Sequence, residues 1–537
     1  MPTQSANLRG QSLIAGEPTF GEAGETTGWN PSTNESLSPT YSLLAIEQLG
    51  AATEAAAESF TSFRSLDPTT RANFLEQIAQ NLTDSSETII ERAKLETGLP
   101  ESRLRGEISR TTGQLSLFAR LVRSGDHHGV RIDPERSERD PRPRTDIRQR
   151  KIPVGPVAIF GASNFPLAFS TAGGDTAAAL AAGCPVVFKA HNAHPGTSEL
   201  VGNGIMEAVK KFELHPGVFS LVFGVGTEIG QALVSDPNIA AVGFTGSRSG
   251  GLALLKTASE RPIPIPVYAE MSSINPVYIF QGALRDDKSD IKALANTYLS
   301  SVTGSSGQLC TQPGLVFVPS TTEGDEFVEA VANAIEHHEG QTMLTSDIHN
   351  AWLNGIHTLA TQEGVVEIGR GETGTTQNSP APTVFQASID AFLSNPVLQS
   401  EIFGAVSLMV RYKDIHDLLR ASQALEGQLT TTLRIGKSDL EGASHLLPIL
   451  EQKAGRLLVN DWPTGVEVGH AMVHGGPFPA TSDPRSTSVG TLAIERFLRP
   501  VAYQNFPQEL LPASLKNDNP WQLNRLIDGV VTKVDEK

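Results

Sequence analysis

The spacing of apolar positions along the chain changes near residue 153. Before that point apolar residues recur at helical intervals, and the tract that precedes them, residues 1–40, is polar and rich in Gly, Ser, Thr and Pro. The N-terminal part is therefore predicted to be mainly helical, with a frayed tip. The helices are expected at residues 43–63, 68–79, 87–96 and 102–122.

After residue 153 short apolar runs alternate with helical patterns. This alternation is typical of a doubly wound parallel sheet with helices on both faces, so we predict an α/β fold. Ligands bind such sheets where the strands end. A second α/β stretch extends from about residue 287 to residue 490. The first strands are expected at residues 157–161, 184–189, 219–223, 240–244 and 265–268.

The segment Gly129–Ile152 has a different pattern. It is crowded with Arg, and its few apolar residues alternate near both ends, with Pro141 and Pro143 in the middle, which predicts a projecting β-hairpin. Two interpretations stay open, a solvated charged arm and a contact between copies of the chain. The tail, residues 496–537, closes with a helix-like pattern.

Length, composition and charge restrict the class of protein. A chain of 537 residues is too long for one hydrophobic core, so two or three domains are expected. Apolar residues at 39% and charged residues at 19% fit a globular protein. The formal net charge of -17 argues against a nucleic-acid partner, which usually meets a basic face, but it leaves room for a local cationic pocket.

Cysteine content and targeting signals indicate the compartment. With only Cys184 and Cys310 the chain can form at most one disulfide, which fits a reducing compartment. The segment Met1–Gly16 does not have the pattern of a signal peptide, and no run of about 18 apolar residues is present. We therefore expect a cytoplasmic protein that does not bind a membrane.

Three polar residues are candidates for chemistry. Cys310 lies among small residues in Ser305-Ser-Gly-Gln-Leu-Cys310-Thr, so it is either a nucleophile on a loop or an inert core cysteine, and composition alone favours the second. Glu270 follows a predicted strand, where burial would raise its pKa toward that of a general base; a capping or salt-bridged carboxylate is the alternative. Asn164 can donate to an oxyanion or form an Asx turn.

Two glycine-rich turns follow predicted strands and open helices. They are Gly224-Val-Gly226-Thr-Glu-Ile-Gly230 and Gly246-Ser247-Arg-Ser-Gly250. Backbone N–H groups in such turns can face a phosphate, although glycine turns in α/β folds are more often only structural.

Together these motifs resemble, in order, those of the aldehyde dehydrogenase superfamily over roughly residues 40–500. The matching segments are Gly161-Ala-Ser-Asn164-Phe165-Pro166, Val186-Val-Phe-Lys189, His215-Pro-Gly217-Val-Phe, Gly243-Phe244-Thr-Gly246-Ser247, Ala269-Glu270-Met, Gly307-Gln-Leu-Cys310 and Ser400-Glu401-Ile-Phe403-Gly404. Within the superfamily, Ala269–Pro276, Lys189–Pro195 and Pro463–Asp483 resemble an NADP-dependent group that oxidises α-ketoglutaric semialdehyde (2,5-dioxopentanoate).

The resemblance implies a fold with a Rossmann-type cofactor domain, an α/β catalytic domain and a β-hairpin oligomerisation element. The cofactor domain would comprise residues 1–128 and 153–285, and the catalytic domain residues 286–490. The hairpin and tail would be residues 129–152 and 491–537. A homodimer or homotetramer is implied.

The resemblance also implies a mechanism. Cys310 would attack an aldehyde, the Asn164 amide and the Cys310 N–H would hold the oxyanion, hydride would pass to the nicotinamide, and Glu270 would activate the water that hydrolyses the thioester. NADP is the implied cofactor, with NAD as a second possibility, and no metal is implied. The implied cofactor-binding residues are Lys189, His191, Asn192, Gly226, Gly230, Phe244, Gly246, Ser247, Glu401 and Phe403.

Three departures from the family pattern bear on these roles. Asn192 stands where an acidic residue usually grips the ribose, which removes a charge that would repel a 2′-phosphate and favours NADP. A family lysine is missing at Ala172-Gly-Gly-Asp175. His474 replaces a usually apolar residue; it is either close to Cys310, lowering its pKa, or a solvent-facing loop residue.

The expected substrate is a small aldehyde that bears a carboxylate, which calls for a cationic partner. Arg110 and Gln114 are four residues apart on a predicted helix and would share one face, and we expect them to bind substrate with Phe165. Three alternatives remain: a fatty or medium-chain aldehyde dehydrogenase, a catalytically silent binding protein, and a thiol hydrolase that uses Cys310 with His474.

Overall fold

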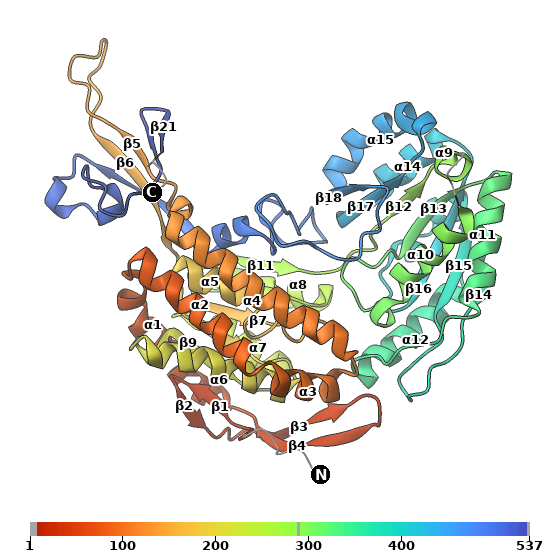
Figure 1. Ribbon diagram of the computed structural model, residues 1–537, viewed down its shortest axis with the longest axis horizontal. Coiled ribbons are helices and arrows are strands. Elements are labelled where there is room, and N and C mark those ends of the chain that lie inside the picture. Colours follow the sequence, from red (N-terminus) through yellow and green to blue (C-terminus); the bar gives the residue numbers. More distant parts are fainter. Residues whose placement is uncertain (1–7, 287–289, 534–537) are drawn as a thin grey trace.

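The computed structural model describes residues 8–286 and 290–533. Two seven-stranded sheets form two lobes, and a five-stranded sheet projects from the first lobe (Figure 1). The first sheet has the order β11-β10-β7-β8-β9-β1-β2. Its parallel strands are β7 (Val157–Phe160), β8 (Val186–Lys189), β9 (Phe219–Val222), β10 (Ala241–Thr245) and β11 (Val267–Glu270). The predicted parallel sheet is thus confirmed, with Glu270 as the last residue of β11 instead of following it.

Helices cover both faces of the first sheet because its strands are apolar on both faces. In β7, Val157 and Ile159 pack into one hydrophobic cluster, while Ala158 and Phe160 pack into another. The first cluster contains α2 (Pro68–Asp84), α3 (Ser86–Thr97), α4 (Glu101–Ser124), α5 (Gly174–Ala182) and α6 (Pro195–Lys211). The second contains α1 (Ile46–Arg64), α7 (Gly226–Ser235) and α8 (Arg248–Ser259).

The predicted helices of the N-terminal part are confirmed by α1–α4, but the polar tract before α1 contains strands that were not predicted. This segment forms β1 (Ser12–Ile14), β2 (Glu17–Thr19), β3 (Glu25–Asn30) and β4 (Glu35–Ser42). The buried residues of β1 add an antiparallel strand to the free edge of β9, which satisfies backbone groups that a coil would leave unpaired. Residues 1–7, which include part of the tip expected to fray, lie outside the described residues.

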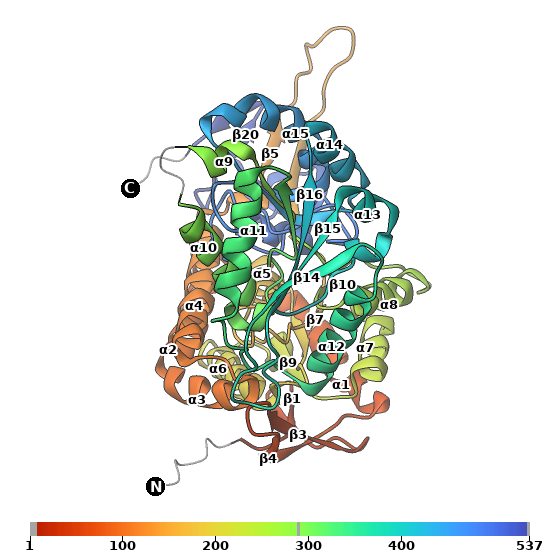
Figure 2. The same ribbon diagram turned by 90° about the vertical axis from the view of Figure 1, so that its right-hand side faces the viewer.

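The second sheet has the order β14-β15-β16-β13-β12-β17-β18, and Figure 2 faces this lobe. Its strands are β12 (Val277–Ile279), β13 (Leu315–Pro319), β14 (Val365–Arg370), β15 (Thr383–Ser388), β16 (Val406–Tyr412), β17 (Gln428–Arg434) and β18 (Ala454–Val459). Because β12 already belongs to it, the chain passes between the sheets ahead of residue 286.

Helices also cover both faces of the second sheet. One cluster packs α10 (Ile291–Thr303) and α11 (Thr322–Ile335) against the strands. The opposite cluster contains α12 (Ser346–Ala360), α13 (Ile389–Ser394), α14 (Ile415–Ala424) and α15 (Leu440–Lys453). The short α9 (Gln281–Arg285) follows β12. Each lobe therefore has a hydrophobic core of its own.

The predicted hairpin is confirmed by β5 (Arg131–Asp133) and β6 (Ile147–Pro153), which pair antiparallel and project from the molecule (Figure 1). The tail joins it through β19 (Leu498–Gln504), β20 (Arg525–Ile527) and β21 (Val530–Thr532). The helix expected near the end of the tail does not form within the described residues. Pairing of β19 with β6 and the prolines that follow β19 favour strands and short 3-10 turns.

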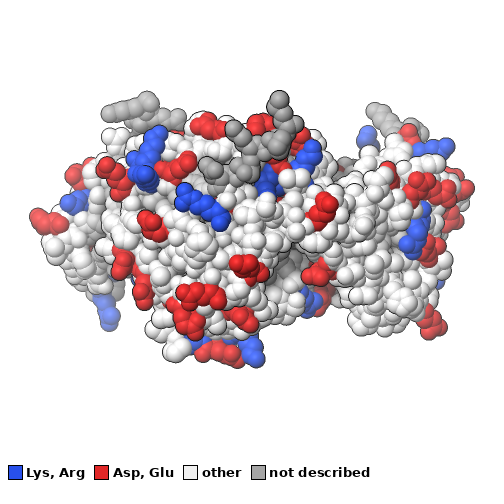
Figure 3. Space-filling model, turned by 90° about the horizontal axis from the view of Figure 1, so that it is seen from below, with Lys and Arg blue, Asp and Glu red and all other residues white. Residues whose placement is uncertain are grey.

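The surface carries the excess of acidic residues in a dispersed form. Figure 3 shows one face on which acidic side chains gather in several small groups with basic ones scattered between them. Among the described residues no helix is long and apolar enough to cross a membrane.

Candidate active site

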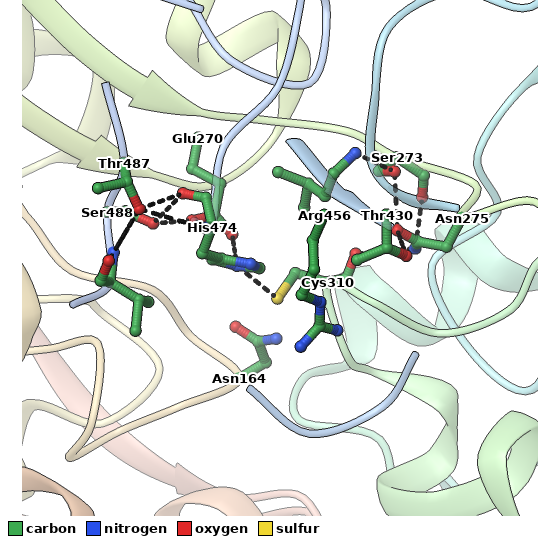
Figure 4. A network of polar contacts seen from close by, with 12 residues as sticks. Asn164, Glu270, Ser273, Asn275, Cys310, Thr430, Arg456, His474, Thr487 and Ser488 are labelled. Atoms are coloured by element: carbon green, nitrogen blue, oxygen red, sulfur yellow. Dashed lines mark hydrogen bonds and ion pairs between the residues drawn. The ribbon is translucent and has the colours of Figure 1, made fainter. Parts of the chain in front are cut away.

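Three predicted residues converge from three distant segments between the lobes (Figure 4). Glu270 ends β11 of the first sheet, Cys310 lies in the loop between α10 and β13, and His474 lies in the long loop after β18. One ligand-type atom from each residue lies within 4.8 Å of the others. A thiol, an imidazole and a carboxylate at this spacing are also a donor set that Zn²⁺ would accept, so assays need a chelator control.

The His474 imidazole lies between the thiol and the carboxylate. Its Nε2 is 3.4 Å from Cys310 Sγ and 2.9 Å from Glu270 Oε1. The His474 side chain is fully buried, and that of Glu270 is 3% exposed. His474 is therefore not the solvent-facing loop residue of the alternative interpretation, and one ring nitrogen faces both partners.

Two hydroxyl groups fix this arrangement. Ser488 Oγ is 2.6 Å from Glu270 Oε2, to which it donates, and Thr487 Oγ1 accepts a hydrogen bond of 2.8 Å from the His474 backbone N–H. The second carboxylate oxygen is thereby satisfied in a site that excludes most water, where an unpaired charge would be costly. Sequence reasoning missed both residues, because nothing near them in the sequence marks them as partners of Glu270.

The electrostatics differ from the two sequence-based expectations. Burial and the adjacent Glu270 charge raise the pKa of Cys310 well above that of an ordinary thiol, so the expected lowering by His474 is wrong. Burial opposes ionisation of Glu270 too, but the His474 contact and the hydrogen bonds from Ser488 and Cys310 hold its pKa below the usual range. The expected rise for Glu270 is therefore also wrong.

The loop that carries Cys310 is strained. Ser305, Ser306 and Gly307 have φ values of 57°, 56° and 67°, a left-handed run that only glycine adopts without cost. A Cβ on Gly307 would lie 2.3 Å from the backbone carbon of Gly404, so glycine is required there. Backbone conformations of this kind persist only where surrounding contacts enforce them.

Asn275 fixes the part of the loop that follows this run. Its Nδ2 donates to the carbonyl oxygens of Cys310 and Gln312, each at 2.9 Å. Its Oδ1 in turn accepts from the hydroxyls of Ser273 and Thr430, at 2.9 and 3.0 Å (Figure 4). The sequence analysis includes this asparagine in the segment Ala269–Pro276 but assigns it no role. Its position directly before Pro276 was the only feature of the sequence that could have indicated one.

Asn164 lies against the same loop. It is 8% exposed, and its Nδ2 donates to the carbonyl oxygen of Gln308 at 3.0 Å. Arg103 on α4 donates to the Asn164 carbonyl at 2.6 Å and lies over the Phe165 ring at 4.7 Å. The carboxylate of the buried Glu107 accepts hydrogen bonds from the backbone N–H groups of Leu167 and Ala168. The amide expected to hold an oxyanion is thus beside the nucleophile loop.

Two arginines lie near the thiol, and only one of them was predicted. Arg110 on α4 donates to the carbonyl of Val466, and Arg456 at the start of β18 donates to those of Gly465 and Pro463, at 2.9 and 2.5 Å. Burial lowers the pKa of both guanidinium groups, and the proximity of Cys310 opposes this for each. Figure 4 shows the Arg456 side chain beside Cys310.

Both guanidinium groups have unused hydrogen-bonding capacity. Within the described residues, Nε and Nη2 of Arg110 and Nε of Arg456 are buried without a partner. Gln114 is 2% exposed and its Nε2 also has no partner among these residues. Donors left in this state indicate a place for an acceptor that the chain itself does not provide.

The predicted cofactor residues lie at the ends of the first-sheet strands. Lys189 ends β8, is 7% exposed, and donates from Nζ to Asn192 Oδ1 at 2.8 Å; its burial lowers the pKa of the amine to about 8. His191 lies in the same loop, where its Nδ1 accepts from the Ala193 N–H at 3.1 Å. Asn192 is exposed, so no carboxylate stands at this position to repel a phosphate.

Two helix N-termini open beside these residues. Gly226 begins α7 and has no atom within 4 Å of the place a Cβ would take, whereas Gly230, a turn later, faces Phe160. Ser247 caps α8 by accepting from the Gly250 N–H at 3.2 Å, and a Cβ on Gly246 would lie 2.7 Å from the ring of Phe244. Free N–H groups at such helix starts suit a pyrophosphate, so the arrangement fits a dinucleotide.

The remaining predicted residues lie on a loop of the second lobe. Glu401 is exposed and Phe403 is half-buried, both between α13 and β16. The negative charge of Glu401 contributes to the raised pKa of Cys310. In the segment that lacks the family lysine, Asp175 pairs with Arg496 at 2.7 Å, so this position serves packing between α5 and the tail.

Comparison with known proteins agrees with this geometry. The family model described as "Aldehyde dehydrogenase family" matches residues 21–477. The chain belongs to the aldehyde dehydrogenase family.

The two relatives that follow share one activity in their names. The chain is 51% identical to "Alpha-ketoglutaric semialdehyde dehydrogenase 2" of Azospirillum brasilense over 97% of this chain and 99% of the relative. It is 46% identical to "Alpha-ketoglutaric semialdehyde dehydrogenase" of Acinetobacter baylyi over 98% of each chain. The solved structure of a putative aldehyde dehydrogenase from Burkholderia cenocepacia shares the fold, with a TM-score of 0.78 at 21% identity, covering 92% of this chain and 100% of that one.

The raised pKa of Cys310 predicts an unusual pH profile for its alkylation. The rate of inactivation by iodoacetamide should keep rising beyond about pH 8.5, the ordinary thiol pKa, because burial and Glu270 disfavour the thiolate. Glu270→Gln removes a like charge, so its profile should move to lower pH. Exposed Glu326→Gln serves as the control and should leave the profile unchanged. A wild-type rate that levels off below about pH 7 would indicate a thiolate–imidazolium pair and contradict this assignment.

Proposed function

We propose that this protein oxidises α-ketoglutaric semialdehyde to 2-oxoglutarate with NADP⁺ as the cofactor. Two near full-length relatives at 51% and 46% identity carry this activity in their names. The observation that carries the chemistry is the contact of Cys310 Sγ with His474 Nε2, which in turn contacts Glu270. The carboxylate of the substrate fits the two arginines beside the thiol.

The chain's own residues divide the reaction between them. Cys310 Sγ loses its proton to the ionised Glu270 carboxylate, to which it is hydrogen-bonded and which passes the proton on to solvent, and forms a bond to the aldehyde carbon. Asn164 and the Cys310 backbone N–H donate to the resulting oxyanion. The nicotinamide, when bound, supplies the oxidant that turns the adduct into a thioester. Glu270 then takes a proton from water, which attacks the thioester carbon and releases Cys310 and the carboxylate product.

His474 also holds the base in place in a site that lacks the family lysine. A contact of 2.9 Å with an ionised carboxylate requires Nε2 to carry its hydrogen and donate it, and the same N–H lies 3.4 Å from Cys310 Sγ. The depressed pKa of Glu270 keeps this carboxylate ionised and ready to accept a proton at neutral pH. His474 is therefore assigned as the residue that positions Glu270 beside the nucleophile.

The cofactor assignment follows the ends of the first-sheet strands. Lys189, His191 and Asn192 would face the adenosine ribose and its phosphate, and the starts of α7 and α8 would face the pyrophosphate. Glu401 and Phe403 would hold the nicotinamide ribose from the second lobe. In this division residues 1–128 and 153–285, except β12 and α9, bind cofactor. The elements β12 and α9 together with residues 286–490 form the part that carries the nucleophile, and residues 129–152 and 491–537 mediate assembly.

The substrate carboxylate is assigned to Arg110 and Arg456, with Gln114 and Phe165 nearby. Their unpartnered N–H groups and their proximity to Cys310 support this, because a dioxo acid has its carboxylate at one end and its aldehyde at the other. Charge-assisted hydrogen bonds to a carboxylate are worth about 1.5–3 kcal/mol each. Such a pocket disfavours long aliphatic aldehydes, which would leave both cations unpaired.

The proposal also includes a homo-oligomeric assembly and a cytoplasmic location. The strands β19 and β21 form the two edges of the projecting sheet in the described chain and offer these edges for pairing with a second copy, in a homodimer or homotetramer. Cys184 and Cys310 are both free thiols, which suits a cytoplasmic enzyme. The second candidate function is cofactor-independent thiol hydrolysis, which the Cys310–His474–Glu270 contact specifically favours.

The first test is reduction of NADP⁺ followed at 340 nm. We expect kcat/KM to be highest for 2,5-dioxopentanoate in a panel with hexanal, decanal and benzaldehyde, and Cys310→Ala to abolish turnover. A preference for decanal would retain the chemistry but overturn the substrate. Hydrolysis of a thioester probe without NADP⁺, with no aldehyde oxidation, would instead favour the hydrolase.

Substitution of Asn192 tests the cofactor assignment. Asn192→Asp should raise KM for NADP⁺ about tenfold or more, because the new carboxylate faces the 2′-phosphate, and should improve use of NAD⁺. Exposed Asn296→Asp on α10 is a control for the added charge alone. If both cofactors respond equally to Asn192→Asp, the residue does not contact the ribose.

The two arginines are tested with charged and neutral substrates. Arg110→Gln and Arg456→Gln should each raise KM for 2,5-dioxopentanoate about tenfold to hundredfold and change KM for pentanal little. Arg105→Gln, on the exposed side of the same helix α4, should change neither. Equal losses on both substrates would show that the arginines only support the loop at residues 463–466.

A further inference from the structure

A cleft lined by basic residues lies far from the candidate active site, at the foot of the projecting hairpin. It lies where the end of α1 and the start of α2 meet β6 and the tail, and it encloses about 450 Å³ including its open mouth. In Figure 1 these elements come together beside the end of α4. The polar lining consists of Arg64, Arg71, His127, His128, Arg150 and Lys151.

Positive charge in this cleft is scarcely balanced. Among its lining residues there is no carboxylate within the described chain, and only Lys151 has a close acidic partner, Glu495, at 2.5 and 2.6 Å. Arg71 donates to backbone carbonyls and lies over the Phe63 ring, and Arg64 lies over the Phe60 ring. These contacts hold the guanidinium groups in place without neutralising them.

Several donors in the cleft are buried without a partner. His127 is 5% exposed, and its Nδ1, Nδ1 of His128 and Nε of Arg150 contact no hydrogen-bond partner among the described residues. The two imidazoles are 4.1 Å apart, and His128 stacks on Trp521 of the tail at 5.6 Å. Buried polar atoms in folded proteins are nearly always satisfied, so these atoms point to a missing acceptor.

The protonation states agree with an electropositive cleft. Burial lowers the pKa of Arg71 to about 10. Burial and the charges of Arg150 and Arg71 lower the pKa of His128 to about 3. The imidazoles are therefore neutral, so each has one N–H donor and one acceptor nitrogen, while the arginines supply the charge.

We propose that this cleft is a binding site for a small multivalent oxyanion of the phosphate or dicarboxylate class. Arg64 and Arg71 reach it from the body of the first lobe, Arg150 from the hairpin, and Trp521 closes it from the tail. A bound oxyanion would bridge three parts of the chain that otherwise repel one another through like charges. The inference does not depend on the substrate or the cofactor proposed above.

The experiment measures thermal unfolding of the full-length protein at constant ionic strength, with chloride replaced stepwise by inorganic phosphate or by malonate. We expect a saturable rise of a few degrees in the unfolding midpoint, because an anion that binds only the folded state stabilises it. The anion that gives the larger rise shows whether the cleft prefers a phosphate or a dicarboxylate. Arg150→Gln should abolish the rise, whereas Arg131→Gln, which removes the same charge from the exposed side of the hairpin, should preserve it.

The melting temperature in chloride alone distinguishes loss of anion binding from general destabilisation of the variant. In chloride alone, Arg150→Gln should melt no lower than wild type, because it relieves repulsion, and half-buried Arg64→Gln should behave in the same way. Titration calorimetry with phosphate and malonate then tests binding directly. The proposal is overturned if neither anion stabilises wild type, if the rise persists in Arg150→Gln, or if Arg131→Gln abolishes it equally.

Discussion

The geometry and the charges of the site depend on one buried imidazole nitrogen that contacts both a thiol and a carboxylate. His474 Nε2 contacts Cys310 and Glu270 at 3.4 and 2.9 Å, so any change in one partner alters the other. Glu270 keeps its charge in this buried position only because His474 and Ser488 bond both of its oxygens. The same charge disfavours ionisation of Cys310, so the resting site holds a neutral nucleophile beside an ionised base.

The strained nucleophile loop follows from this constraint. The thiol has to reach the imidazole from the second lobe, and the left-handed run Ser305–Gly307 turns the chain toward it. Unsupported, such conformations cost of order 1–3 kcal/mol per residue. Asn275 fixes the chain just beyond this run by donating to the carbonyls on both sides of Thr311, and it is itself fixed by Ser273 and Thr430. The polar network in Figure 4 is therefore one continuous support for a single sulfur atom.

The parallel sheets and the hairpin were accessible from the sequence because periodicity encodes them. The roles of Cys310 and Glu270 came from the family resemblance, and two interpretations of His474 stayed open. The strands β1–β4 were not accessible, since short polar strands such as Glu25–Asn30 have the composition of loops. Arg456 and Ser488 were missed because their roles arise from contacts across the lobes, which no local pattern records. The direction of the pKa shifts failed for a similar reason: burial was anticipated for Glu270, but the hydrogen bonds that outweigh it come from residues 204 and 218 positions away.

The short passage from β11 to β12 has a mechanical consequence. Within a few residues the chain leaves the first sheet at Glu270, places Asn275 under the nucleophile loop, and enters the second sheet at Val277. Base and nucleophile thus belong to separately cored bodies hinged at this segment. A slight opening between them disconnects the sulfur from its imidazole while both hydrophobic cores stay intact. Catalytic activity in this molecule therefore depends on the docking of its two halves as well as on the fold of each.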